Sequence, residues 1–217
     1  MNVRDFKINI PAEQIEDLRR RLSATRLPSS LGANRWDDGA SLVFMQRLVE
    51  YWLNKFDWRA QEARLNRLPQ YLATVDGLDL HFVHQPGKEP APIPLVLTHG
   101  WPGSFIEMER VIPLLADPAA HGGDPADAFH VVVPSLPGFG FSAPPTAPGV
   151  DSYRVAELWL KLMHGFGYGR FAAQGGDIGA GVSTWLAGTH CRVEELATTR
   201  TVLAEQGFVR GRHEVFE

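Results

Sequence analysis

Gln174-Gly175-Gly176-Asp177-Ile178-Gly179-Ala180-Gly181 is the segment around which this chain of 217 residues is interpreted. A short apolar run, residues 171–173, precedes it, and residues 182–186, which are predicted to open a helix, follow. A strand, a tight turn with its reactive residue between small neighbours, and a helix together form a nucleophile elbow. The pattern is Gly-x-Asp-x-Gly centred on Asp177, with aspartate where serine is more familiar. An aspartate that caps an ordinary helix is the simpler explanation of this segment alone, so other motifs must decide.

Length and composition place the chain among ordinary globular proteins. Its length suits one sizeable domain or about one and a half, and the formal net charge of −4 gives no case for binding nucleic acid or an anionic membrane. No apolar run approaches the ~20 residues that span a bilayer, and the N-terminus has no signal-peptide core. The single Cys191 suits a reducing compartment. The composition therefore predicts a soluble, cytoplasmic protein without a membrane anchor.

The first section, residues 1–76, is predicted to be rich in helices. Alternating residues 6–10 predict a short strand or extended arm, and Pro11 stands at the first position of a helix whose charge order suits the helix dipole. Apolar side chains at helical spacing predict a second helix over residues 42–56, and residues 59–68 a third. We interpret these apolar stripes as packing surfaces.

The second section, residues 77–217, alternates strands with helices. The predicted strands cover residues 78–83, 93–98 and 129–133. Helical patterns over residues 105–115 and 155–166 separate them and lead to the strand before Gln174. This alternation predicts an α/β fold with a parallel sheet.

A second glycine-rich turn, His99-Gly100-Trp101-Pro102-Gly103-Ser104, directly follows the strand predicted at residues 93–98. Such a turn leaves main-chain N–H groups pointing into the crevice where α/β folds bind ligands. In α/β-hydrolases, one oxyanion-hole N–H comes from this loop and the other from the residue after the nucleophile. These donors are the N–H groups of Trp101 and Ile178 if Asp177 is the nucleophile. A plain left-handed turn is the alternative.

A third tight turn, residues 134–142, follows the next strand, so three such turns are expected at one edge of the sheet. Together they are typical of a hydrolase cleft. The segments that carry a family resemblance are residues 99–104, 134–142 and 174–180, and the motif Asp57-Trp58-Arg59-x-Gln61-Glu62-x-Arg64-Leu65-Asn66. They resemble the α/β-hydrolase-fold epoxide hydrolases of the microsomal and juvenile-hormone type, over residues 4 to about 187.

The resemblance implies a domain organisation and a reaction. Residues 1–76 would be the epoxide hydrolase N-terminal domain, which in the family extends to about residue 108, and residues 77–217 the first half of the core. Asp177 would be the nucleophile, with the N–H groups of Trp101 and Ile178 as the oxyanion hole. The implied reaction hydrolyses a small-molecule epoxide to a vicinal diol through an aspartyl ester, without cofactor or metal, in detoxification or aromatic hydrocarbon catabolism.

An aspartate suits this chemistry. Attack on an sp³ carbon by serine would leave an ether that water cannot readily cleave, whereas a carboxylate leaves an ester that water can hydrolyse. The oxyanion hole serves that second step, where one donor is typically worth ~3 kcal/mol. A carboxylate is also ionised at pH 7 without a base to activate it.

The sequence departs from the family after Leu186. The family's lid tyrosines, its water-activating histidine and the acid that orients this histidine have no counterpart, so we predict a C-terminally truncated, incomplete α/β-hydrolase core. The Asp177 strand would then be an exposed apolar edge. His190 and His213 follow Asp177 but are interpreted as surface residues. Ile178 replaces the usual tryptophan, which is tolerable because only its N–H acts.

Several alternatives stay open. The chain could be an active hydrolase once assembled with a complementary C-terminal fragment or as a homo-oligomer, or an inactive fragment or interaction protein. Haloalkane dehalogenases also use a carboxylate on sp³ carbon, although the long N-terminal section argues against that function. His81 and His84 point to opposite faces of a strand and make a poor metal pair. Residues 165–169 imitate a dinucleotide fingerprint but precede a strand, so we reject a nucleotide cofactor.

Overall fold

The computed structural model describes residues 1–29, 32, 34–37, 39–88 and 92–189. The chain divides into two compact units: Ile8–Arg67 is one, and Met1–Lys7 together with the residues from Leu68 onward is the other. None of the helices in the described part has the length and apolar character needed to cross a membrane.

The unit Ile8–Arg67 contains the three helices that the sequence predicts. They are α1 (Ala12–Ser23), α2 (Leu42–Asn54) and α3 (Trp58–Leu65). Side-chain caps fix two of the starts: Ser41 Oγ accepts the N–H of Phe44 at 3.3 Å, and Asp57 Oδ1 accepts that of Ala60 at 3.1 Å. Pro11 directly precedes α1, where its lack of an N–H costs nothing.

Two polar side chains of α3 and its C-terminal end hold the extended segment before α1. Asn66 bonds Ile8 twice, since its Oδ1 accepts the Ile8 N–H at 2.8 Å and its Nδ2 donates to the Ile8 carbonyl at 2.9 Å. Glu62 accepts the Ile10 N–H at 2.8 Å and pairs with Arg59 at 2.6 Å. The motif that carried the family resemblance in this section therefore binds the main chain of the segment before α1.

The other unit is built on a six-stranded mixed sheet with the order β1-β2-β3-β5-β4-β6. The strands are β1 (Val3–Phe6), β2 (Gln70–Val75), β3 (Leu78–Gln85), β4 (Ile93–Thr98), β5 (Phe129–Pro134) and β6 (Ala172–Gly175). The strand expected at residues 6–10 lies earlier, as β1, and β2 was not predicted. The α/β class is confirmed, but the sheet is parallel only among β5, β4 and β6.

The antiparallel half of the sheet follows from a tight turn. Asp76 and Gly77 alone connect β2 to β3, and both have positive φ, of 51° and 80°. A two-residue turn of this kind can join only antiparallel strands, and its backbone twist suits a hairpin. The parallel arrangement expected for the whole sheet is therefore wrong for β1, β2 and β3.

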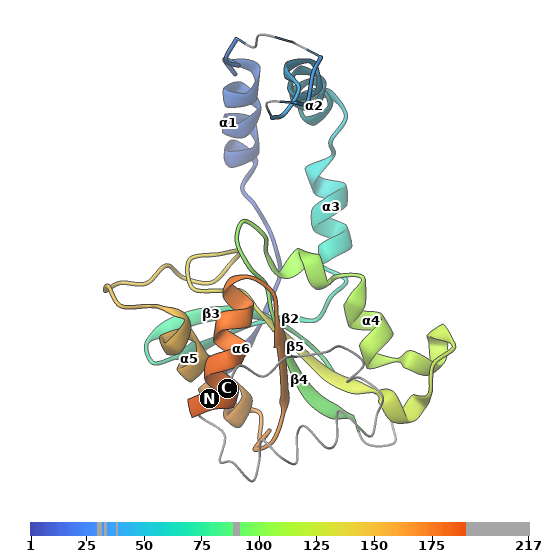
Figure 1. The fold of residues 1–217 in the computed structure, drawn as a ribbon, viewed down its shortest axis with the longest axis vertical. Coiled ribbons are helices and arrows are strands. Elements are labelled where there is room, and N and C mark those ends of the chain that lie inside the picture. Colours follow the sequence, from blue (N-terminus) through green and yellow to red (C-terminus); the bar gives the residue numbers. More distant parts are fainter. Residues whose placement is uncertain (30–31, 33, 38, 89–91, 190–217) are drawn as a thin grey trace. The chain divides into compact units, whose positions relative to one another are not determined.

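Helices cover both faces of this sheet (Figure 1). On one face lie α5 (Ser152–Gly165) and α6 (Ile178–Thr189), and on the other α4 (Val111–Ala116). The helix expected over residues 105–115 is instead a short 3₁₀ turn, Phe105–Met108, followed by α4. Trp159 of α5 is fully buried and donates its Nε1–H to Thr98 Oγ1 at 3.1 Å, which joins this helix to the end of β4.

Candidate active site

Asp177 lies on the turn between β6 and α6 and has a positive φ of 54°, which is rare for a residue with a side chain. Its neighbours must be small. A Cβ placed on Gly175 would lie 2.3 Å from the carbonyl oxygen of Gly179, and one on Gly179 only 2.1 Å from that of Thr98. The turn thus has the tightness of a nucleophile elbow.

The alternative role of Asp177 as an ordinary helix cap does not fit the hydrogen bonds. A cap side chain accepts the second or third N–H of its helix. Here the N–H of Gly179 donates to the Gly176 carbonyl at 2.8 Å, and that of Ala180 donates to the main-chain carbonyl of Asp177 at 3.0 Å. The Asp177 side chain instead reaches Trp101 in the loop that follows β4.

The Asp177 carboxylate receives one main-chain N–H group from the loop after β4 and one from the first residue of α6. The N–H of Trp101 donates to Oδ1 at 2.8 Å, across 76 positions of sequence. The hydrogen bonds from the N–H groups of Trp101 and Ile178 hold the pKa of Asp177 below its usual range. The three residues predicted from the sequence to form the site therefore lie together. Their catalytic roles stay predictions.

The loop after β4 must come close to Asp177 for this contact. A Cβ on Gly100 would lie 2.5 Å from the Asp177 Cβ, so only glycine fits between the two turns. The side chain of Trp101 is 68% exposed, so the carboxylate lies beside an open surface and not inside the core. A ligand can therefore approach from the side where the parallel strands have their carboxyl ends.

His99 joins this loop to the third turn, and sequence analysis did not assign it a role. Its ring is buried, with Nε2 3.1 Å from the main-chain nitrogen of Leu136 and Nδ1 3.1 Å from the carbonyl oxygen of Gly100. Burial lowers the pKa of His99. Its position at the start of the motif was the only sequence signal that could have pointed to it.

All three predicted turns lie together at the carboxyl ends of the parallel strands. The parallel strands β4, β5 and β6 each end directly before one of them, so their carboxyl ends meet there. Among the described strands β6 pairs with β4 alone, which makes it an edge strand as expected.

Three polar side chains in the core are linked in series by hydrogen bonds, as the side chains of a catalytic triad are. His81 Nδ1 lies 2.9 Å from Ser135 Oγ, and His81 Nε2 lies 3.0 Å from Gln70 Oε1. All three are buried, and burial lowers the pKa of His81 to about 4. Ser142 Oγ accepts the N–H of His81 at 2.9 Å and donates to the Ser135 carbonyl at 2.7 Å. These side chains therefore support the third turn and have no access to a substrate.

The remaining histidine predictions fall in two groups. His84 Nε2 contacts Tyr168 Oη at 3.0 Å, whereas the ring of His81 contacts Ser135 and Gln70. Within the described ranges no group of three or more possible metal ligands occurs. His190 and His213, like Cys191, lie outside the described residues.

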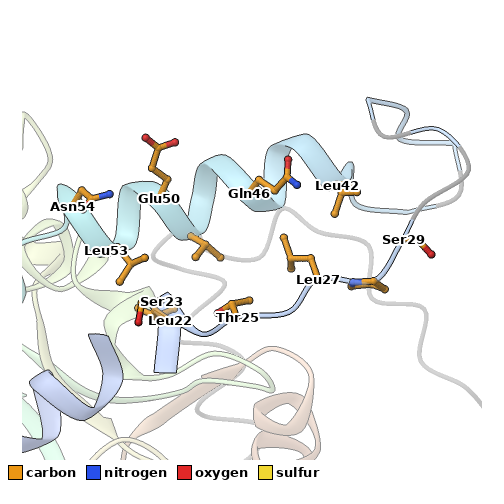
Figure 2. A pocket seen from close by; sticks show the side chains of 12 residues that line it. Leu22, Ser23, Thr25, Leu27, Ser29, Leu42, Gln46, Glu50, Leu53 and Asn54 are labelled. Atoms are coloured by element: carbon orange, nitrogen blue, oxygen red, sulfur yellow. The ribbon is translucent and has the colours of Figure 1, made fainter. Parts of the chain in front are cut away.

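A groove of about 510 Å³ lies elsewhere, within the helical unit (Figure 2). Leu42 and Leu53 point from α2 toward the segment that carries Leu22 and Leu27. Among the described residues that line it, Glu50 is the single titratable one. The groove lacks the paired groups that catalysis needs, so we place the candidate site at Asp177.

Family comparisons agree with this geometry. The model described as "Epoxide hydrolase N terminus" matches residues 3–108, and the "alpha/beta hydrolase fold" model matches residues 93–201. The chain belongs to the epoxide hydrolase family. It is 53% identical over 182 residues to a protein of Stigmatella aurantiaca that is named as an epoxide hydrolase. That match covers 84% of the chain and 41% of the relative.

Two further relatives place the chain in the same family. Identity to epoxide hydrolase 1 of Oryctolagus cuniculus is 40%, over 86% of the chain and 42% of that protein. The solved epoxide hydrolase of Aspergillus niger superposes with a TM-score of 0.78 at 34% identity, over 88% of the chain and 50% of the solved one. The chain thus spans about two fifths of the length of the curated relatives it matches.

Proposed function

We propose that this chain carries the nucleophilic half of an epoxide hydrolase site, with Asp177 as the nucleophile. The observation that supports this most is the 2.8 Å hydrogen bond from the Trp101 N–H to Asp177 Oδ1. One carboxylate oxygen is held, and the N–H groups that lower the pKa of this carboxyl further favour its ionised form. The second oxygen, Oδ2, is the atom we assign to the attack.

The first step forms an ester. Asp177 Oδ2 attacks an sp³ carbon of the epoxide, the carbon–oxygen bond of the ring breaks, and the electron pair moves to the epoxide oxygen, which takes up a proton. The product is a hydroxyalkyl ester of Asp177. The ring strain of the epoxide drives this opening, and the fixed carboxylate provides the orientation.

The second step releases the diol. Water adds to the carbonyl carbon of the ester, and the negative charge develops on Oδ1, which already accepts the Trp101 N–H. The Ile178 N–H, which also bonds this carboxylate, is the second donor we assign to the oxyanion hole. Collapse of this intermediate expels the diol and restores the carboxylate. Ile178 is suited to this role because its contribution comes from the main chain.

Mass spectrometry of the chain after incubation with styrene oxide tests the first step. We expect an adduct of the intact epoxide on the peptide that contains Asp177, and none in Asp177→Asn, which keeps the shape of the side chain but removes its nucleophilic charge. Diol formation by the unmodified chain with the same dependence on Asp177 would also support the proposal. An adduct on another residue, or neither adduct nor diol, would refute it.

A single turnover in H₂¹⁸O, with the separately expressed C-terminal portion of a longer relative added, tests the second step. Because water attacks the ester carbonyl carbon, the ¹⁸O label should appear in the Asp177 carboxylate, and the first diol released should carry the unlabelled oxygen of the protein. Labelled diol from the first turnover would mean that water attacks the epoxide directly, without an ester.

We also propose that a complementary C-terminal segment supplies the acid and base that these steps need. The matching relatives are more than twice as long as the aligned region. Adding the separately expressed C-terminal portion of such a relative is expected to convert the Asp177 adduct to diol. An unchanged adduct with a stably bound fragment would exclude this partner.

A further inference from the structure

His99 belongs to the loop that provides the Trp101 N–H, yet it contacts neither Asp177 nor the surface. Both of its ring nitrogens are occupied by main-chain groups. The main-chain nitrogen of Leu136 can only donate, so Nε2 of His99 must accept. A neutral imidazole carries one proton, which therefore sits on Nδ1 and is donated to the carbonyl of Gly100. Leu136, in the third turn, thereby fixes the tautomer of His99.

The carbonyl of Gly100 and the N–H of Trp101 belong to one peptide unit. In a trans peptide these two groups point in opposite directions, and Trp101–Pro102 is the cis bond of this loop, one position later. Holding the Gly100 carbonyl on the His99 side therefore turns the Trp101 N–H to the other side, where Asp177 Oδ1 accepts it at 2.8 Å.

The orientation of this peptide unit needs to be fixed because its first residue is a glycine. Gly100 has to be glycine, since a Cβ would lie 2.5 Å from that of Asp177. Glycine also leaves the backbone free to rotate, since it lacks the steric limits that other residues impose. The same residue that allows the two turns to approach therefore leaves the Trp101 N–H without a fixed direction.

We propose that His99 is a positioning residue for the oxyanion hole: its Nδ1–H holds the Gly100–Trp101 peptide so that the Trp101 N–H faces Asp177. The proposal deepens the proposed function and rests on it for its catalytic meaning. Protonation of Nε2 would remove the acceptor for the Leu136 N–H. Burial opposes that protonation, while the charge of Glu107 and the Gly100 carbonyl favour it.

Two substitutions separate the roles of the two ring nitrogens. In His99→Asn, the side-chain N–H takes the place of Nδ1 and keeps the donor to Gly100, but the acceptor for Leu136 is lost. In His99→Gln, the amide oxygen takes the place of Nε2 and keeps that acceptor, but the donor to Gly100 is lost. His81→Gln is the matched control, because it removes a buried histidine that supports the same third turn without touching Gly100.

The measurement is the pKa of Asp177, followed by carboxyl ¹³C NMR in the full chain without substrate. We expect this pKa to rise toward its usual value in His99→Gln, because the Trp101 hydrogen bond that lowers it is weakened, and to stay low in His99→Asn and His81→Gln. The rate of Asp177 alkylation by styrene oxide should fall about 10-fold in His99→Gln alone, as expected for a misaligned carboxylate.

Equal pKa values of Asp177 in the native chain and His99→Gln would overturn the proposal, as would the same shift in all three variants. Should His99→Gln not fold, ¹⁵N NMR of the native chain decides, because a proton found on Nε2 contradicts the assigned tautomer and one on Nδ1 supports it. The pKa series needs no turnover. An unreactive Asp177 with the predicted order of pKa values would therefore refute the proposed function and leave the role of His99 intact.

Discussion

Replacing Gly179 by alanine should destabilise the protein, although alanine is the better helix former. The added Cβ would lie 2.1 Å from the carbonyl oxygen of Thr98 and 3.1 Å from that of His99. These are main-chain atoms at the end of β4, which cannot rotate aside as a side chain can. Overpacking typically costs 1–3 kcal/mol, and with rigid neighbours we expect about 3 kcal/mol, or roughly 6–12 °C in Tm for a chain of this size.

Gly188→Ala is the matched control for this prediction. It lies in the same helix, and no atom lies within 4 Å of its added Cβ. Without a clash, alanine should stabilise the protein by about 0.5–1 kcal/mol. Urea unfolding followed by circular dichroism should therefore separate the two variants by about 4 kcal/mol. If Gly179→Ala proved as stable as Gly188→Ala, the close approach of α6 to β4 would be wrong, and with it the reasoning about the Asp177 turn.

Two further predictions concern buried polar groups. The pKa of His81 is about 4 in the folded chain and about 6.5 in the unfolded one, so unfolding takes up a proton between these values. The contribution of His81 to stability is therefore complete well above pH 6.5 and falls by about 3 kcal/mol toward pH 4. Urea titrations at both pH values should show a smaller loss in His81→Gln, and an equal loss would contradict the assignment. Glu62→Gln should cost about 1–2 kcal/mol, because it weakens charged hydrogen bonds to Ile10 and Arg59. Glu50→Gln, at an exposed position, should change the unfolding free energy by less than ~0.5 kcal/mol.

The sequence predicted most elements in which the apolar side chains form one continuous run or recur at one regular spacing. The apolar run at residues 93–98 is β4 in full, and the stripe from Val155 to Phe166 follows α5 to its C-terminal cap, one residue beyond Gly165. β2 was missed because Gln70–Val75 neither alternates cleanly nor forms an apolar run, and it lies next to a helical section. The Asp-Gly pair at residues 76 and 77 is a strong hairpin signal. That pair could have identified both β2 and the antiparallel half of the sheet.

The candidate site was predictable as far as main-chain geometry controls it. Glycine spacing marks the turns that come close together, so the contact of Asp177 with Trp101 and Ile178 could be expected from residue types alone. The role of His99 could not, because it depends on which nitrogen meets which loop. That pairing is set by the distance between two turns that lie 37 positions apart. Only the folded structure shows which ring nitrogen of His99 contacts which loop.

The geometry of the site also explains why Ile178 can stand where relatives are expected to have tryptophan. What the carboxylate of Asp177 receives from position 178 is a main-chain N–H, which every residue except proline provides. The same holds for Trp101, whose exposed ring takes no part in the hydrogen bond. The sequence constraint therefore falls on the positions that determine where the backbone runs: Gly100, Gly175 and Gly179 allow the turns to approach, and His99 sets the direction of one peptide between them.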